Sequence, residues 1–354
     1  MIKIVLVQEW LPPYRVELFK QIRREFSEHS VDFQIVVGGQ SEKYIGRESY
    51  QGTLDFATSV TRRDFKVGHA RISVARIRKL LSDADLVVFE QARRNLYLYP
   101  LLSIPKLLRK RKLLLWGHGK DHHASSFLSK KLLLWLTNRS DGLLLYKSFE
   151  NGGKSEGIEV PLYEIGNSVY SEAELEEIRN VSSRVKFPPQ FLFLGSISKD
   201  KKIEDFIEAA RISHNLNLNY SFVVAGIGPD FDWIKSQATG NVHFVGSVQG
   251  SSKSKLISES VCLVIPDAIG LVAIDALAHG KYIFTNSAAG IHGPEFLYAL
   301  EADIIKHYSD ASDLVSQLES LVKINSRPEI KRRAESIETI ARNFVGSCLR
   351  ALDI

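Results

Sequence analysis

One stretch of the chain, at positions 261–285, restricts the fold more than any other. It reads VCLVIPDAIGLVAIDALAHGKYIFT. The first apolar run predicts a buried strand, Gly270 lies in a short loop, and residues 271–279 predict an apolar helix that ends at Gly280. A second apolar run, residues 281–285, follows at once. Strand, helix and strand in direct succession favour an α/β fold with parallel strands.

Two carboxylates interrupt this apolar background, Asp267 in the loop and Asp275 inside the helix. Burying a charge is costly unless a partner pairs with it or hydrogen-bonds to it, and the hydroxyls of a ligand would supply such bonds. A phosphate on the same ligand would favour the helix N-terminus beside Gly270, where free N–H groups attract anions. The segment therefore suits a sugar nucleotide. The alternative is that Asp275 is a solvated helix residue.

The bulk composition is that of a soluble protein with two domains. The chain has 354 residues, of which 44% are hydrophobic and 25% charged, and this length allows two domains of ordinary size. No apolar run approaches the roughly 20 residues that cross a bilayer. The start, MIKIVLVQEW, predicts a first buried strand and no signal peptide. The two cysteines, Cys262 and Cys348, form no disulfide framework and favour the cytoplasm.

Charge is distributed unevenly along the chain. Residues 1–165 carry 27 Lys and Arg against 18 Asp and Glu, a balance of +9, whereas residues 166–354 carry 19 against 23, a balance of −4. A basic half joined to an acidic half predicts that the first half meets an anionic surface or acceptor. Nucleic acid is disfavoured as this partner, because the chain has no zinc-finger spacing and no RNA-binding aromatic motif. An anionic membrane surface fits better.

Short apolar runs alternate with helical patterns in the first half. This alternation predicts a parallel sheet covered on both faces. The polar, glycine-bearing segment 38–56 predicts a loop. The expected strands are residues 2–7, 32–37, 86–89, 112–116 and 142–146, and the expected helices are residues 14–26, 70–81 and 127–137.

The pattern restarts after a predicted linker at residues 161–174. A restart favours a second Rossmann-like domain over one large sheet. We therefore predict domains at 1–165 and 166–327, followed by one or two helices within 328–354. Before the segment at 261–285, the expected strands are residues 191–195, 220–226 and 242–246, and the expected helices are residues 203–215, 231–239 and 252–259.

Residues 261–285 resemble the donor-site motif of glycosyltransferase family four, a group of GT-B enzymes. That motif places two glutamates, separated by seven residues, around a Gly-Phe-Gly-Leu turn. Asp267 and Asp275 stand at the glutamate positions, each one methylene shorter. The resemblance implies two Rossmann-like domains with parallel sheets facing a central cleft, the first binding the acceptor and the second the donor. It also implies a terminal helix that crosses back to the first domain. The turn positions are held by Ala268, Ile269, Gly270 and Leu271.

The segment FLFLGSISKDKK extends the resemblance to the start of the second domain. Gly195 matches the family's glycine, and Lys201 matches its lysine that contacts the donor phosphates. Ser196 replaces the family's arginine at the next position. One phosphate contact is then either missing or supplied by Lys199 or Lys202. A lysine pair after a glycine-containing loop also suits a diphosphate on charge grounds.

Two further glycine motifs carry the same resemblance. Gly226 and Gly228 are similar to the family's Gly-x-Gly-Pro turn, where glycine permits close approach of the backbone to a ligand. Gly290, Gly293 and Glu295 resemble the Gly-Gly-x-x-Glu segment that follows the donor motif, with looser spacing. The resemblance implies that these positions bind the donor. The resemblance is close over about residues 140–325 and loose before them.

His118 is the first candidate in the first half, because it follows the expected strand 112–116. Ligands in open α/β sheets bind beyond the carboxyl ends of strands. In family-four relatives a histidine at the corresponding strand end contacts the transferred sugar, so the resemblance implies this role here. The alternative is a core histidine bonded to backbone. His122 and His123 are adjacent on a loop, and we expect no metal site there.

The loop after the first strand, QEWLPPYRVELF, contains no G-x-G-x-x-G, which argues against a nicotinamide dehydrogenase. In GT-B enzymes this loop often shapes the acceptor pocket. Glu9, Tyr14 and Arg15 are therefore our candidates for contacts with an acceptor sugar or its phosphate. The alternative is that Arg15 is an ordinary surface residue.

Two segments, at 95–116 and 127–139, mix basic, aromatic and aliphatic residues. This mixture suits an interfacial membrane contact. Leucines beside lysines also occur on any surface helix that packs on a sheet. The residues concerned are Tyr97, Tyr99, Lys106, Arg109, Lys110, Arg111 and Lys112 in the first segment and Lys130, Lys131 and Trp135 in the second.

The resemblance implies a cytoplasmic, peripheral-membrane glycosyltransferase that retains anomeric configuration without a bound metal. It would move a sugar from a nucleoside diphosphate sugar to a hydroxyl of a lipid-linked, lipopolysaccharide-type or cell-surface glycan. Asp275 would hold the ribose, Asp267 the transferred sugar, and Lys201 the diphosphate. One alternative is a sugar-nucleotide epimerase or hydrolase on the same fold. Another is a catalytically inert GT-B protein that binds partners or glycans.

Overall fold

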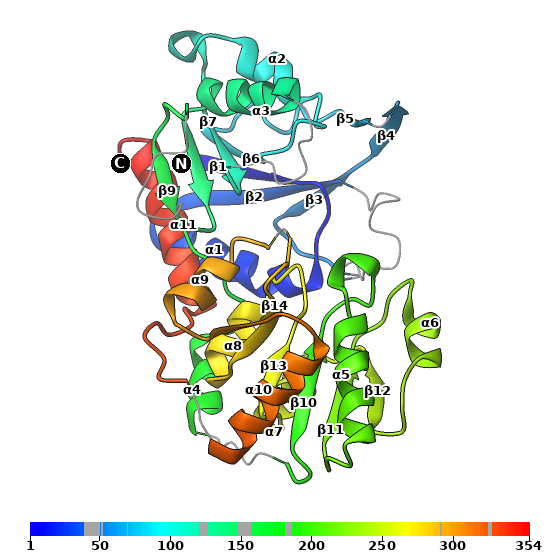
Figure 1. Ribbon diagram of the computed structural model, residues 1–354. Coiled ribbons are helices and arrows are strands. Elements are labelled where there is room, and N and C mark those ends of the chain that lie inside the picture. Colours follow the sequence, from blue (N-terminus) through cyan, green and yellow to red (C-terminus); the bar gives the residue numbers. More distant parts are fainter. Residues whose placement is uncertain are drawn as a thin grey trace. The chain divides into compact units, whose positions relative to one another are not determined.

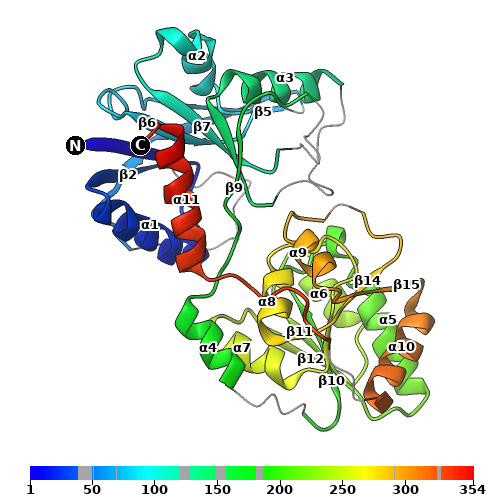
Figure 2. The ribbon, with the colours of Figure 1, turned by 90° about the vertical axis from the view of Figure 1, so that its left-hand side faces the viewer.

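A computed structural model shows the protein as two compact units (Figures 1 and 2). Unit 1 comprises residues 1–169 and 335–354, and unit 2 comprises residues 170–334. The C-terminal end of the chain thus belongs to the same unit as its start. The structure describes residues 1–38, 50, 52–68, 70–119, 127–147, 157–180, 186–290, 292–324 and 328–354.

Unit 1 contains a seven-stranded parallel sheet in the order β3-β2-β1-β6-β7-β8-β9. The direction in which strands are added reverses between β1 and β6. In open sheets the carboxyl ends at such a reversal usually form the ligand site. The strands are β1 (Ile2–Gln8), β2 (Val31–Gly38), β3 (Ala57–Val60), β6 (Leu86–Glu90), β7 (Lys112–Gly117), β8 (Gly142–Leu145) and β9 (Leu162–Glu164).

Helices cover both faces of this sheet (Figure 1). Because strand side chains alternate, Leu114 packs in the cluster shared with α1 and α11, whereas Leu115 packs in the cluster shared with α2 and α3. The helical elements are η1 (Pro13–Arg15), α1 (Val16–Glu28), α2 (Leu98–Ser103), η3 (Lys106–Leu108), α3 (Phe127–Arg139) and α11 (Ile337–Ala351).

The last helix, α11, packs against α1 (Figure 2). Its start is capped by Ser336, whose side chain accepts a hydrogen bond from the backbone N–H of Thr339. Phe344 is fully buried, and its ring centroid lies 5.3 Å from that of Trp116 and 6.2 Å from that of Phe26. Residues far apart in the sequence therefore complete one hydrophobic core.

The expectation of a helix at residues 70–81 is wrong. Residues 70–75 form strand β5 (Ala70–Ala75), which pairs antiparallel with β4 (Arg62–Val67). Ile72 and Val74 are β-branched and alternate along ARISVA, as a strand requires. The pairing partner lies outside the window that shows the helical period, so the local pattern was misleading. Of the predicted loop at 38–56, residues 39–49 and 51 lie outside the described residues.

Unit 2 contains a six-stranded parallel sheet in the order β12-β11-β10-β13-β14-β15. Here the direction reverses between β10 and β13. Together the two sheets confirm the predicted α/β class, with two Rossmann-like units. The strands are β10 (Gln190–Leu194), β11 (Ser221–Ala225), β12 (Val242–Gly246), β13 (Cys262–Val264), β14 (Ile283–Asn286) and β15 (Ile305–Tyr308).

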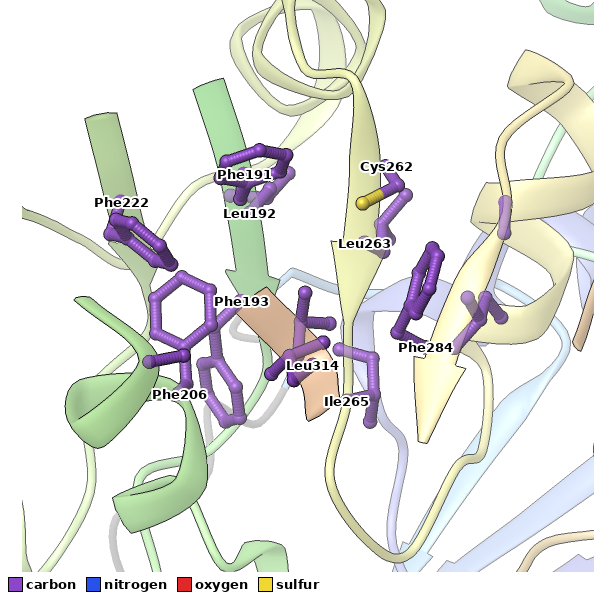
Figure 3. Packing of buried hydrophobic residues seen from close by; sticks show 14 of the residues in the cluster. Phe191, Leu192, Phe193, Phe206, Phe222, Cys262, Leu263, Ile265, Phe284 and Leu314 are labelled. Carbon is purple, nitrogen blue, oxygen red and sulfur yellow. The ribbon is translucent and has the colours of Figure 1, made fainter. Parts of the chain in front are cut away.

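The core of unit 2 is rich in phenylalanine (Figure 3). Phe193, Phe206 and Phe222 are fully buried, and the ring of Phe206 in α5 contacts that of Phe193 in β10 at a tilt and that of Phe222 in β11 edge-on. Helix α8 contacts α4, α7 and α9. The helical elements are α4 (Glu172–Asn180), η5 (Lys199–Lys201), α5 (Glu204–Asn215), α6 (Phe231–Ser236), α7 (Gly250–Glu259), α8 (Val272–His279), α9 (Phe296–Glu301) and α10 (Ala311–Ile324).

Truncating Phe344 tests the packing of α11. We expect Phe344→Ala to lower the free energy of unfolding of unit 1 by about 3–5 kcal/mol, because the change leaves a cavity between α11 and the sheet. Urea unfolding followed by tryptophan fluorescence measures this loss, since Trp116 lies against Phe344. Arg342→Ala, at an exposed position of the same helix, is the control. An unchanged midpoint in the Phe344 variant would contradict the packing.

Candidate functional site

The loops at the carboxyl edge of the unit 2 sheet contact one another. The loop after β10 hydrogen-bonds to the segment that ends β11 and follows it, through Gly195 N–H to the carbonyl of Ala225 and Ile197 N–H to that of Ile227. The loop after β13 is bonded to the loop after β14, where Gly293 N–H donates to the carbonyl of Ile269. These loops surround the point where the strand order reverses. This edge is where a ligand is expected.

Asp267 lies in the loop after β13 and is 6% exposed. Its carboxylate forms an ion pair with Lys202 at 2.9 Å and accepts hydrogen bonds from the backbone N–H groups of Ala268 and Gly290 at 2.7 and 2.8 Å. Burial alone raises the pKa of Asp267, but the ion pair and these N–H groups outweigh it and hold the pKa below its usual value. The carboxylate is therefore charged at neutral pH.

Lysines 201 and 202 reach the same loop from η5. The ammonium of Lys201 donates to the backbone carbonyl of Ala268, beside the Lys202–Asp267 pair. Lys202 and Ala268 both adopt left-handed backbone conformations, with φ of 46° and 52°. Such conformations are costly for residues other than glycine and are often found at functional sites. Lys199, the other candidate, is exposed.

Asp275 lies in the first turn of α8 and is 5% exposed, which excludes a solvated helix residue. Its Oδ1 accepts hydrogen bonds from the hydroxyl of Tyr170 and from the ammonium of Lys253, the latter at 2.6 Å. Sequence analysis suggested that hydroxyls of a ligand would bond to Asp275. In the structure, Tyr170 and Lys253 already provide hydrogen bonds to this carboxylate. Among the described residues, no hydrogen bond reaches Oδ2 of Asp275.

Sequence reasoning missed Lys253 and Tyr170. Lys253 lies in the polar run GSSKSK at the start of α7, which looks like a solvated helix end. Tyr170 precedes α4, in the segment interpreted as a linker. Both meet Asp275 only because α4 and α7 pack against α8. The one local signal is the buried charge of Asp275 itself, which requires a partner without indicating which residue provides it.

Two of the predicted donor-binding glycines are required by close packing. A Cβ at Gly226 would lie 1.8 Å from the carbonyl oxygen of Gly195, and one at Gly228 would lie 2.1 Å from that of Ile197. A Cβ at Gly195 or Gly270 would meet nothing within 4 Å. Glycine at 226 and 228 therefore lets two loops touch, whereas positions 195 and 270 face open space.

The remaining predicted donor residues lie around the start of α8. Glu295 is 6% exposed. Its carboxylate lies close to Gly293, because a Cβ built on Gly293 would lie 2.7 Å from Glu295 Oε2 and 3.3 Å from the Cα of Gly270. Leu271 is half-buried and precedes α8, and Ser196 is exposed. His292, which sequence reasoning missed, accepts a hydrogen bond from the backbone N–H of Ile269 at 3.1 Å.

In unit 1, Glu9 follows β1 at the edge where the strand order reverses. It is 1% exposed and meets arginines from three places in the chain. Arg62 and Arg71 come from the β4–β5 hairpin, at 3.5 and 3.3 Å, and Arg94 follows β6. The hairpin that sequence analysis missed therefore supplies part of this cluster.

Arg15, Tyr14 and His118 lie at the same edge of the unit 1 sheet. The Arg15 guanidinium donates to the hydroxyl of Tyr146 and stacks 4.9 Å from the ring centroid of Trp116, so Arg15 is not an ordinary surface residue. Tyr14 is 45% exposed. His118 follows β7, and it is exposed, with its ring centroid 5.2 Å from that of Tyr146. A core histidine is thereby excluded.

The described residues contain no group of three or more His, Cys, Asp or Glu side chains that could hold a metal ion. His122 and His123 lie outside the described residues. The expectation of metal-free chemistry stays a prediction. Among the helices that the structure describes, none is long and apolar enough to cross a bilayer.

A comparison with protein families identifies the domain that carries these loops. Residues 174–339 match the family model described as "Glycosyl transferases group 1". These residues form a group 1 glycosyltransferase domain. The assignment supports sugar transfer as the general function of the protein. No curated protein shows a significant sequence match.

Solved structures similar to this chain show that its fold is GT-B. The UDP-GlcNAc 2-epimerase from Methanocaldococcus jannaschii has 12% identity and a TM-score of 0.61, with 99% of each chain covered. A glycosyltransferase from Rickettsia africae ESF-5 has 14% identity and a TM-score of 0.59, with 99% of this chain and 95% of that chain covered. Anabaena Alr3699/HepE in complex with UDP and glucose has 12% identity and a TM-score of 0.55, at the same coverage. At these identities the likeness concerns the fold alone.

Adding one methyl group at Gly226 tests the contact between the loops after β10 and β11. We expect Gly226→Ala to destabilise unit 2 by about 1–3 kcal/mol, because the new Cβ collides with a backbone carbonyl that must move. Thermal unfolding measures the loss. Gly240→Ala, where a Cβ meets nothing within 4 Å, should leave the midpoint nearly unchanged. Equal midpoints for both variants would show that the two loops do not touch.

Proposed function

We propose that this protein transfers a sugar from a nucleoside diphosphate sugar to a hydroxyl of an acceptor glycan, with retention of configuration, as a member of glycosyltransferase family four. The observation that carries the proposal is the charged junction of Lys201, Lys202 and Asp267. It lies at the strand-order reversal of a group 1 glycosyltransferase domain. Two ammonium groups and one carboxylate suit a ligand with a diphosphate and a sugar on adjacent atoms.

The diphosphate is assigned to the lysines and to the start of α8. Lys201 and Lys202 provide positive charge, and α8 begins just after Gly270, so the positive end of its helix dipole favours an anion there. The open faces of Gly195 and Gly270 leave room for the ligand beside the backbone. Stabilising the leaving diphosphate is the main work in such a reaction, and here positive side chains and helix N–H groups do it without a metal.

The sugar and the ribose are assigned to the two aspartates. Asp267, charged and held by backbone N–H groups, accepts hydrogen bonds from the transferred sugar. At Asp275, Tyr170 and Lys253 occupy Oδ1 and fix the carboxylate, so Oδ2 is the atom assigned to a ribose hydroxyl. Glu295 and the glycines at 226 and 228 shape the surrounding loops.

The acceptor is assigned to unit 1. Glu9, Tyr14 and Arg15 lie at the carboxyl edge of its sheet, and we assign them to the acceptor. His118, exposed at the end of β7, is assigned to the transferred sugar. The acceptor proposed is a lipid-linked, lipopolysaccharide-type or cell-surface glycan, which connects this reaction with a membrane.

The proposed membrane contact comprises exposed apolar and basic side chains of two segments of unit 1, residues 106–110 and helix α3. Leu107 is 99% exposed, Leu128 76% and Phe127 69%, which is unusual for such residues. Lys106, Lys110, Lys130 and Lys131 are exposed in the same two segments, and the ammonium of Lys131 lies 4.5 Å from the ring centroid of Phe127. The apolar side chains would insert at the boundary of the acyl chains, and the lysines would contact anionic headgroups. Such a surface suits the inner face of a plasma membrane, with the protein in the cytoplasm.

Arg109, predicted as part of this basic surface, has a structural role. Its side chain is 3% exposed and forms an ion pair with Asp141 at 3.1 Å. It also donates to the backbone carbonyls of Ile104 and Arg139. The membrane surface is therefore defined without it, as Lys106, Leu107, Leu108, Lys110, Phe127, Leu128, Lys130, Lys131 and Trp135.

A sugar-nucleotide epimerase or hydrolase is the second candidate, because the fold is also that of the M. jannaschii epimerase. Such an enzyme consumes the donor without an acceptor. An inert binding protein is a third candidate, which the two aspartates in place of glutamates and Ser196 in place of arginine favour. Mass spectrometry of the products from a panel of nucleotide sugars, with and without a membrane extract, separates the three.

The double variant Asp275→Asn/Lys253→Met tests the donor site. Removing both charges together avoids an unpaired buried ammonium, which would itself destabilise the domain. We expect a folded protein whose affinity for a nucleoside diphosphate falls at least about tenfold, a loss of roughly 1.4 kcal/mol. Isothermal titration with UDP, GDP and ADP measures it. Asp232→Asn, exposed on α6, is the control, and wild-type affinity in the double variant would overturn the assignment.

The membrane surface is tested by removing charge without touching the core. We expect changing Lys106, Lys110, Lys130 and Lys131 to Gln to weaken binding to anionic vesicles at least about tenfold, since each lysine near such a surface contributes on the order of 1 kcal/mol. Co-sedimentation with phosphatidylserine-containing vesicles measures this. The matched control changes Lys235, Lys255, Lys323 and Lys331 of unit 2. Equal binding of both quadruple variants would contradict the proposal.

A further inference from the structure

A row of polar side chains crosses the strand-order reversal of unit 1. Glu90 ends β6 and pairs in register with Trp116 of β7. The register of β1 with β6, which runs to Val7 opposite Phe89, places Gln8 beside Glu90. Side chains of a strand alternate between faces, so these three project on the face that Trp116 shares with α1 and α11. Arg15, in the element η1 that leads into α1, lies over Trp116.

Three hydrogen-bond donors, two in this row and one on the overlying Arg15, have no partner among the described residues. They are Nε2 of Gln8, Nε of Arg15 and Nε1 of Trp116, and all three atoms are buried. Gln8 and Trp116 are each 3% exposed. A buried donor without an acceptor costs about 1–3 kcal/mol, and native proteins contain few of them. Three unpaired donors close together at the ends of these strands therefore indicate a ligand site, in which oxygen atoms of the ligand accept their hydrogen bonds.

The Glu90 carboxyl provides an acceptor in the same row. Burial is the main reason that its pKa rises to about 7, and the neighbouring charge of Glu9 adds to the rise. Arg94 and Arg15 act in the opposite direction. The hydroxyls of Tyr97 and Tyr146 also face Glu90, and both stay protonated at neutral pH. Near pH 7, Glu90 therefore exists both as a neutral acid and as a carboxylate.

Aromatic rings complete the surroundings. The ring centroids of Trp116 and Tyr146 lie 5.6 Å apart, and the Arg15 guanidinium lies within 5.2 Å of each. Tyr14, next in the chain to Arg15, is exposed. The exposed ring of Tyr14 suits the apolar C–H face of a pyranose, while a few convergent polar groups bond its hydroxyls. The carboxyl groups of Glu90 and Glu9 lie beside the arginines and would repel an anionic ligand, so a neutral sugar fits this site better.

We propose that Gln8, Arg15, Glu90 and Trp116 form a subsite for one neutral pyranose ring of the acceptor. The three donors contact sugar oxygens, and Glu90 accepts a hydrogen bond from one hydroxyl. The subsite rests on the proposed transferase function, which provides the acceptor. An ionised carboxylate accepts this bond more strongly than the neutral acid does. Pyranose binding is therefore strong above pH 7 and weakens as the pH falls through 7.

The test measures binding of methyl pyranosides, including methyl glucoside, methyl galactoside and methyl N-acetylglucosaminide, by ligand-observed NMR at pH 6 and pH 8. For the wild type, the dissociation constant of the preferred sugar should be about tenfold higher at pH 6, in line with the ionised fraction of a group of pKa 7. Glu90→Gln keeps the shape and should abolish this pH dependence. Glu17→Gln, exposed on α1, should preserve it.

A second variant keeps the inference falsifiable if Glu90→Gln does not fold. Trp116→Phe retains an aromatic face but removes the Nε1 donor, and should weaken sugar binding several-fold at both pH values. Binding of no pyranoside, or a pH dependence that survives in Glu90→Gln, would overturn the subsite. UDP titration of the same samples separates a failure of the pyranose subsite from a failure of the proposed donor site. Absence of nucleotide binding in the wild type would count against the donor site of unit 2 instead.

Discussion

The buried carboxylate of Asp275 is the constraint on which unit 2 depends. Helix α8 is apolar apart from this residue and the terminal His279, and a charge within it requires a compensating partner. Lys253 from α7 and Tyr170 before α4 provide the compensation. The same contacts fix how α4 and α7 pack on α8 and so where α8 begins. Asp267 lies in the loop that leads into this helix and is held there by the backbone N–H groups of Ala268 and Gly290.

Both units place a carboxylate held by cations where the strand order reverses. In unit 2 the carboxylate is Asp267, and the lysines come from the neighbouring loop after β10. In unit 1 it is Glu9, and the arginines come from a hairpin and from the segment after β6. Fixed charges at a strand edge are organised before a ligand arrives, so little reorganisation is needed on binding. A family of sugar-transferring enzymes is consistent with such preorganised polar edges.

Much of the fold was predictable because strands and helices in α/β units carry strong local patterns. The runs that became β1, β6, β7, β10 and β11 are short, apolar and separated by helical stretches. The β4–β5 hairpin was not, because residues 70–75 also fit a helical period and their pairing partner, residues 62–67, lies just before the window that shows this period. Arg109 shows the same limit for function. Its charge suggested a membrane contact, whereas its ion pair with Asp141, distant in sequence, makes it structural.

The sequence by itself determined the residues whose role depends on local chemistry. Asp267 and Asp275 stand out as charges in an apolar segment, and Gly226 and Gly228 as residues without a Cβ at a strand end. Only the tertiary structure decided their partners, Lys253 and Tyr170 for Asp275 and the carbonyl of Gly195 for Gly226. It also brought Gln8, Glu90 and Trp116 into one row. The physical reason is that a sheet register joins residues distant along the chain, which no local pattern encodes.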